Sequence, residues 1–117
     1  MSDIKEKVKD VNDMILSGKG MEAFEKHYHE DVVMQENNQE PTEGKEANRK
    51  RELESMSAVE EFHGAEVKNV ALGDEVSMVE WMFDMTYKGG QRTCINQVAV
   101  QKWENGKIIS ERFYYDS

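Results

Sequence analysis

The sequence has little of several residue types, and each shortage excludes a class of protein. Its 117 residues include one cysteine, Cys94, so no disulfide can form within the chain and no paired-cysteine zinc pattern exists. No apolar run is long enough to cross a membrane, and none follows the first residues. The sequence therefore predicts neither a membrane span nor a signal peptide, and we expect a cytoplasmic protein.

Basic residues are also in the minority. The chain has 15 Lys and Arg against 24 Asp and Glu, which gives a formal net charge of −9. Because this charge repels phosphate backbones and anionic lipids, we expect neither nucleic acid nor a membrane as a partner. The one basic cluster, Lys45, Arg49, Lys50 and Arg51, is interleaved with glutamates and indicates a solvated helix face.

The length fits a single domain over residues 1–117, and its first half is mainly helical. Apolar residues at helical spacing predict two helices, the first through Ile4, Val8, Val11 and Ile15, the second through Met21, Phe24 and Tyr28. A strand is expected over residues 32–37. A loop with the only proline then leads to a third helix over residues 45–56, for which Thr42 is a candidate N-cap.

From His63 onward the pattern changes to strands. Glycine-bearing turns separate runs rich in β-branched and aromatic residues, at Gly73-Asp74, Gly89-Gly90 and Asn105-Gly106. The resulting order, α-α-β-α-β-β-β-β, predicts an α+β domain. In it, helices cover one face of a curved antiparallel sheet.

Alternation along the strands places two carboxylates on apolar faces. Glu36 shares a face with Val32 and Met34, and Glu111 shares one with Ile109, Phe113 and Tyr115. A buried carboxylate without a partner costs several kcal/mol, so each residue must be paired, protonated or next to a wet cavity. Glu36 is a candidate general base or a strand-end residue that emerges into a loop. Glu111 is a candidate second acid, or a structural carboxylate paired with an arginine or a tyrosine hydroxyl.

The same alternation predicts an apolar pocket for a ligand. Its candidate lining residues are Trp81, Phe83, Met85, Gln97, Gln101, Trp103, Phe113 and Tyr115. The glutamine amides could hydrogen bond a ligand inside such a pocket. The aromatic and methionine side chains could equally serve as plain core packing.

The histidines do not predict a metal site. His27 and His29 lie at the end of the second predicted helix, where residues two apart point about 200° away from each other. They indicate surface or helix-end histidines beside Glu30 and Asp31. Cys94 faces outward with no evident base beside it, so we expect neither metal, nor cofactor, nor a cysteine nucleophile.

Three segments carry a family resemblance: FEKHYHEDVVMQEN (24–37), GKEANR (44–49) and NQVAVQKWENGKIISERFYYD (96–116). With the order of elements, they resemble the SnoaL-like, ketosteroid-isomerase-like branch of the nuclear-transport-factor-like superfamily. The resemblance covers nearly the whole chain. It implies a cone-shaped α+β barrel wrapped around the first helix, with a pocket at one end. It also implies a homodimer through the outer sheet face, where Val98 and Val100 would need cover.

The family's catalytic residues are only partly present. By the resemblance, Glu36 occupies the place of the isomerases' general base, and Glu111 is a loose match to the acid of the polyketide cyclases. The two oxyanion donors of the isomerases fall at Val11 and Ala99, which cannot donate, so steroid isomerisation by that mechanism is not expected. We expect a domain that binds a small, partly hydrophobic molecule. Any catalysis would be cofactor-free acid–base chemistry of isomerase, cyclase or lyase type. The alternative is a non-catalytic dimerisation or protein-association domain.

Overall fold

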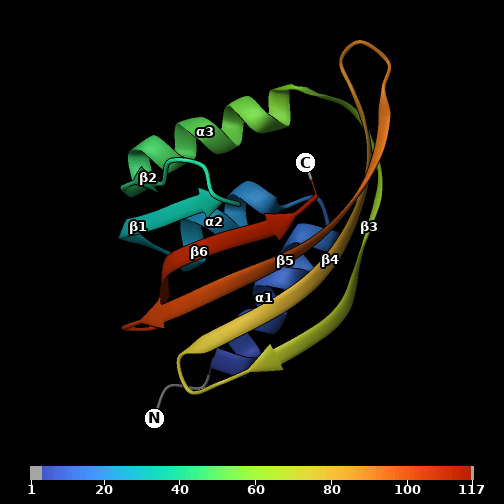
Figure 1. The fold of residues 1–117 in the computed structure, drawn as a ribbon. Helices are drawn as coiled ribbons and strands as arrows, with labels where there is room; N and C mark the ends of the chain where they lie inside the picture. The colour runs from blue at the N-terminus through green and yellow to red at the C-terminus, as the bar shows by residue number, and fades with distance from the viewer. Residues whose placement is uncertain (1–3, 117) are drawn as a thin grey trace.

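The computed structural model describes residues 4–116. Their elements, in chain order, are α1 (Ile4–Leu16), α2 (Gly20–His27), β1 (Tyr28–Glu36), β2 (Thr42–Glu43), α3 (Lys45–Ser57), β3 (Val59–Leu72), β4 (Val76–Tyr87), β5 (Arg92–Glu104) and β6 (Lys107–Tyr115). The long strands β3 to β5 curve around α1, and α3 lies over β1 (Figure 1). The α+β architecture expected from the sequence is confirmed, with the short β2 as an addition.

The sheet is mixed, which corrects the expectation of a purely antiparallel one. Its strand order is β2-β1-β6-β5-β4-β3, and β1 pairs with β6 in parallel while the other neighbours are antiparallel. The hairpins from β3 to β6 are the ones that the glycine-bearing turns predicted. The parallel pair differs because α3 and the meander bring the chain back beside β1, running in the same direction.

The core lies between α1 and the inner, concave face of the sheet. Ile4, Val8 and Val11 form the buried stripe of α1, and they pack with apolar residues of α2 and the strands. This stripe is the one that the helical spacing predicted. No helix among residues 4–116 combines the length and the apolar character needed to cross a membrane.

Two boundaries differ from the predicted ones. Tyr28 is buried as expected, but it opens β1 instead of closing α2, because the chain becomes extended directly after His27. Thr42 does not cap α3, whose N-cap is Gly44 with a φ of 94°. The buried amide of Asn48 donates instead to the carbonyl oxygens of Thr42 (2.9 Å) and Gly44 (2.8 Å) and so fixes the start of the helix.

A bulge corrects the predicted inner face of β6. Trp103 pairs with Ile108 and Lys102 with Ser110, so Ile109 is an extra residue on β6. The alternation predicted Ile109 on the inner face, but Ile108 is the fully buried residue there. The bulge restores the predicted alternation from Ser110 onward, and Glu111 therefore still points inward.

Candidate functional site

The strand register brings the two inward carboxylates onto neighbouring strands. Glu111 of β6 pairs with Met34 of β1 and with Gln101 of β5, while Glu36 of β1 pairs with Phe113 of β6. Residues that pair directly across a sheet share a face. Glu36 and Glu111 therefore lie on the same inner face, two residues apart along the strand direction. Their surroundings are very different.

Glu111 is sealed inside the protein, with 3% of its surface exposed. The Tyr28 hydroxyl donates to its Oε1, and the Gln101 amide donates to its Oε2 at 2.8 Å. Burial raises the pKa of Glu111 to about 7, although both hydrogen bonds favour the ionised form. Burial and the neighbouring carboxylate likewise hold the pKa of Tyr28 well above its usual range. Of the alternatives left open by the sequence, this geometry matches a structural carboxylate held by a tyrosine hydroxyl.

A chain of buried hydrogen bonds fixes the amide of Gln101. The indole Nε1–H of Trp103 donates to Ser77 Oγ (2.9 Å), and this hydroxyl donates to Gln101 Oε1 (2.7 Å). The indole nitrogen can only donate, and the Ser77 hydroxyl passes its own proton to the Gln101 oxygen. In this arrangement Gln101 presents its NH₂ group to Glu111. Gln101 and Trp103, two predicted ligand contacts, are engaged within the core.

Glu36 lies in a more open setting, with 28% of its side chain exposed. Arg51 of α3 donates from Nη2 to Oε2, and the hydroxyl of Tyr115 on β6 donates to Oε1. Burial, together with the bond to Glu36, raises the pKa of Tyr115 to about 12, so its phenol stays a donor at neutral pH. Side chains from α3 and β6 thus converge on this carboxylate of β1.

The end of β1 is fastened to β6 directly after Glu36. The backbone N–H of Asn37 donates to the carbonyl of Phe113 (2.8 Å), and its side-chain oxygen accepts the N–H of Tyr115 (3.0 Å). Glu36 is therefore held beside Tyr115, although it is the last residue of its strand. A glutamate that simply emerges into a loop would lack these restraints.

Sequence reasoning missed two residues of this site. The basic cluster was predicted to be a solvated helix face, but Arg51 points to Glu36 and half-buried Glu52 lies close enough for its charge to raise the pKa of Glu111. Burial, and then the charge of Glu36, raise the pKa of Glu52 itself. The sequence of α3 has no apolar stripe that could have shown which of its charged residues face the sheet.

The other predicted lining residues divide by depth. Trp81 is buried in the core and stacks on Phe83, with ring centroids 5.1 Å apart. Phe83 itself is half-buried, and so are the residues Met85, Gln97, Phe113 and Tyr115. The half-buried members lie toward the same end of the inner face as Glu36. This end of the face is the part that a small molecule could reach.

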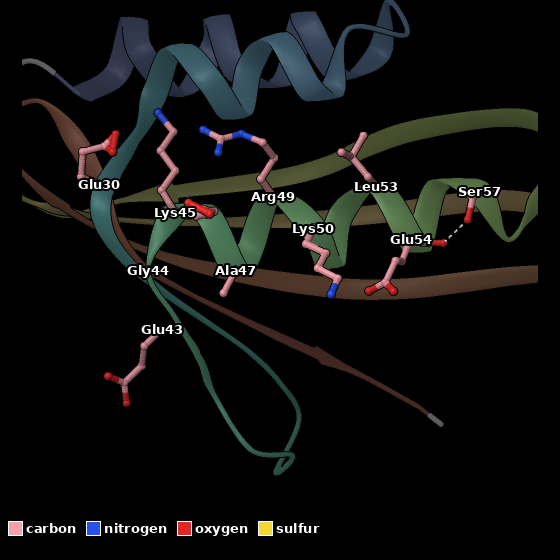
Figure 2. A pocket seen from close by; sticks show the side chains of 11 residues that line it. Glu30, Glu43, Gly44, Lys45, Ala47, Arg49, Lys50, Leu53, Glu54 and Ser57 are labelled. Carbon is pink, nitrogen blue, oxygen red and sulfur yellow. Dashed lines mark hydrogen bonds between the residues drawn. The ribbon is translucent and has the colours of Figure 1, made fainter.

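A groove of about 970 Å³ lies elsewhere, along α3. Figure 2 shows Lys45, Arg49 and Leu53, which line it, pointing from α3 toward α2. Arg49 is held there by Glu25 of α2, with N–O distances of 2.6 and 3.0 Å. A second groove of about 420 Å³ lies on α2. Neither groove is lined by a predicted site residue.

The histidines have separate partners. His27 is buried rather than at the surface, which corrects that part of its prediction. Its Nε2 lies 2.7 Å from Asp10 Oδ2, an oxygen that also accepts from Lys26. His29, half-buried on β1, accepts the backbone N–H of Asp31 at 2.9 Å. Within residues 4–116, no three His, Cys, Asp or Glu side chains are grouped as metal ligands.

Comparisons with known proteins agree with this architecture. The family model of the SnoaL-like domain matches residues 3–115. A crystal structure from Mesorhizobium loti, named for the SnoaL-like polyketide cyclases, is 30% identical and superposes with a TM-score of 0.88. The alignment covers 97% of this chain and all of that one. A search of curated proteins gave no significant match.

Two more distant structures share the fold. The epoxide hydrolase/cyclase-like enzyme SalBIII, with a role in pyran ring formation in salinomycin, is 23% identical, with a TM-score of 0.79 over 96% of this chain and 89% of its own. A ketosteroid-isomerase-like protein from Catenulispora acidiphila, in complex with trimethylamine, is 13% identical, with a TM-score of 0.78 over 95% and 85%. From its family match, its 30% identical relative and its fold, the chain belongs to the SnoaL-like domain family, as its sequence motifs predicted.

Proposed function

We propose that this SnoaL-like domain binds a compact, partly hydrophobic molecule on the half-exposed end of its inner face. Glu36 acts there as the carboxylate base of cofactor-free chemistry of isomerase, cyclase or lyase type. The observation that carries the proposal is the position of Glu36, held by Arg51 and Tyr115 at the accessible end of an otherwise apolar face. The proposal includes the cytoplasmic location that we expect from the sequence.

Accessibility favours Glu36 over Glu111 as the base. A general base must come within hydrogen-bond reach of the proton that it removes. Glu111 is sealed, with 3% of its surface exposed, whereas Glu36 is 28% exposed on its side chain. Phe83 and Phe113 supply half-buried apolar surface at the same end of the face. This combination of apolar walls and one oriented polar group is typical of small-molecule sites.

A ligand screen followed by an isotope exchange assay tests this function. Small cyclic ketones, lactones and aromatic acids are screened by thermal shift, and NMR then follows the exchange of ligand C–H groups with D₂O. We expect stabilising ligands to exchange, and Glu36→Gln to slow that exchange by about 100-fold or more. The matched control is Glu43→Gln, at an exposed position on β2. The proposal fails if no compound stabilises the protein, or if both variants slow exchange equally.

The outer sheet face favours a second candidate function, association with another copy of the chain. Met78 and Tyr114 are 45% and 44% exposed, and they pair with Val100 and Val98 across the strands. These side chains form a patch that also contains Glu80 and Arg112. Such a patch commonly marks an interaction surface. We expect light scattering to show a homodimer that Tyr114→Glu dissociates. The control Leu53→Glu, at a 51% exposed position on α3, should leave it intact.

A further inference from the structure

Arg51 is the cation that α3 directs at the inner face. Along the strands of residues 28–115, the inward residues given by the register include no Lys, Arg or His. On α3, Lys45 donates to the backbone carbonyl of Glu25 and Arg49 binds the Glu25 carboxylate. Arg51 alone among these cations meets the half-exposed part of the inner face.

Most of the hydrogen-bonding capacity of Arg51 is unused. A guanidinium carries five N–H donors in a planar fork that matches a carboxylate. Within residues 4–116, only the Nη2 bond to Glu36 engages this group, and 33% of the side chain is exposed. Glu36 also has a second donor, the hydroxyl of Tyr115, on its other oxygen. Glu36 can therefore keep one partner if Arg51 turns to another anion.

We propose that Arg51 is the anchor for an anionic oxygen of the ligand, which replaces Glu36 as the partner of the guanidinium. The ligand class is a compact cyclic or aromatic carboxylate, or a molecule that develops an enolate or phenolate oxygen beside Glu36. This inference rests on the proposed function, since it assigns a partner within the same site. Arg51 also supplies a hydrogen-bond donor for an oxyanion, which Val11 and Ala99 cannot provide.

The charges around the site leave the anion and Glu36 in competition for Arg51. The titratable groups that face it are Glu36 and Tyr28 on β1, Glu52 on α3, Tyr87 on β4, and Glu111 and Tyr115 on β6. Without a ligand, the charge of Arg51 is balanced by Glu36. Once the ligand takes Arg51, Glu36 is left beside a second anion and close to Glu52. Glu36 then keeps the hydroxyl of Tyr115 as its donor.

Isothermal titration calorimetry with matched acid and amide pairs tests the anchor. The probes increase in size: cyclohexanecarboxylate, benzoate and 2-naphthoate, each beside its neutral amide. We expect the wild type to prefer at least one acid over its amide by tenfold or more, and Arg51→Met to abolish that preference. Arg49→Met, which removes a cation of the same helix from the opposite side, should leave the preference unchanged.

Glu36→Gln provides the second readout. It should tighten acid binding, because the acid then no longer competes with a carboxylate for Arg51. This readout does not depend on whether Arg51→Met folds, which circular dichroism and thermal melting report.

The possible failures are distinguishable. If no acid or amide binds the wild type, the ligand site of the proposed function fails and the anchor fails with it. If acids and amides bind equally, or if Arg51→Met keeps the acid preference, only the anchor is overturned. Unchanged or weaker acid binding in Glu36→Gln would contradict the exchange of Arg51 between Glu36 and the ligand.

Discussion

The buried carboxyl of Glu111 should make the domain less stable as the pH rises from acidic to slightly basic. Burial raises its pKa from 4.5 to about 7. Between these two values the folded protein holds a proton on Glu111 that the unfolded chain has lost. Because the folded state binds more protons there, the free energy of unfolding falls with increasing pH.

The size of this effect follows from the two pKa values. Raising the pKa from 4.5 to about 7 costs the folded state about 3 kcal/mol, at about 1.4 kcal/mol per pKa unit. The free energy of unfolding falls by most of this amount, about 2.5 kcal/mol, between pH 5 and pH 8. Asp10, Asp84 and Glu25, whose pKa values are lowered by their partners, lose their stabilising effect below that window.

The variant Glu111→Gln isolates the contribution of Glu111 to the pH dependence of stability. The fixed amide of Gln101 can still donate to the new side-chain oxygen, and the new NH₂ group can donate to the Tyr28 hydroxyl oxygen. Urea unfolding of both proteins at pH 5 and pH 8 should show the variant gaining about 2.5 kcal/mol relative to the wild type at the higher pH. If the two proteins lose stability in parallel between these pH values, Glu111 is ionised in the folded protein throughout, and the reasoning is wrong.

Other substitutions test the buried hydrogen bonds and the backbone. Trp103→Phe removes the donor to Ser77 and should lower the free energy of unfolding by about 1–3 kcal/mol, measured in urea. Asn48→Ala frees the carbonyl oxygens at the start of α3 and should cost a similar amount, about 1–3 kcal/mol. Gly106→Ala places a side chain at a φ of 80°, and it should lower the stability by about 1 kcal/mol or more. Gly20→Ala, in a helix with open space around the Cα, should instead be neutral or stabilising in the same assay.

Local patterns predicted the parts of the fold that local interactions determine. Helical spacing gave the buried stripe of α1, and alternation put Glu36 and Glu111 on the inner face. The bulge at Ile109 was not predictable, because its cause is the pairing of β5 with β6 and not the composition of β6. The parallel pairing of β1 with β6 is likewise a contact between distant segments, which no short window contains.

The candidate site was predicted only in its strand half. Glu36 and Tyr115 followed from alternation, which holds whenever a strand forms. Arg51 and Glu52 did not, because a helix rich in charges has no apolar stripe to show which side faces the sheet. The direction of α3 is set by contacts such as the Asn48 amide with the carbonyls near its start, and these depend on how the chain is folded around it.

The position of β6 in the sheet has a consequence for how the protein folds during its synthesis. β6 leaves the ribosome after the other five strands of the sheet, yet it lies between β1 and β5 and so joins an early segment to a late one. The Tyr28–Glu111 contact spans 83 residues of chain. Contacts of this range are slow to form. Until residues 107–115 have emerged, β1 has no partner on that edge, so a nascent chain that stalls before them would expose two incomplete sheets to aggregation and chaperones.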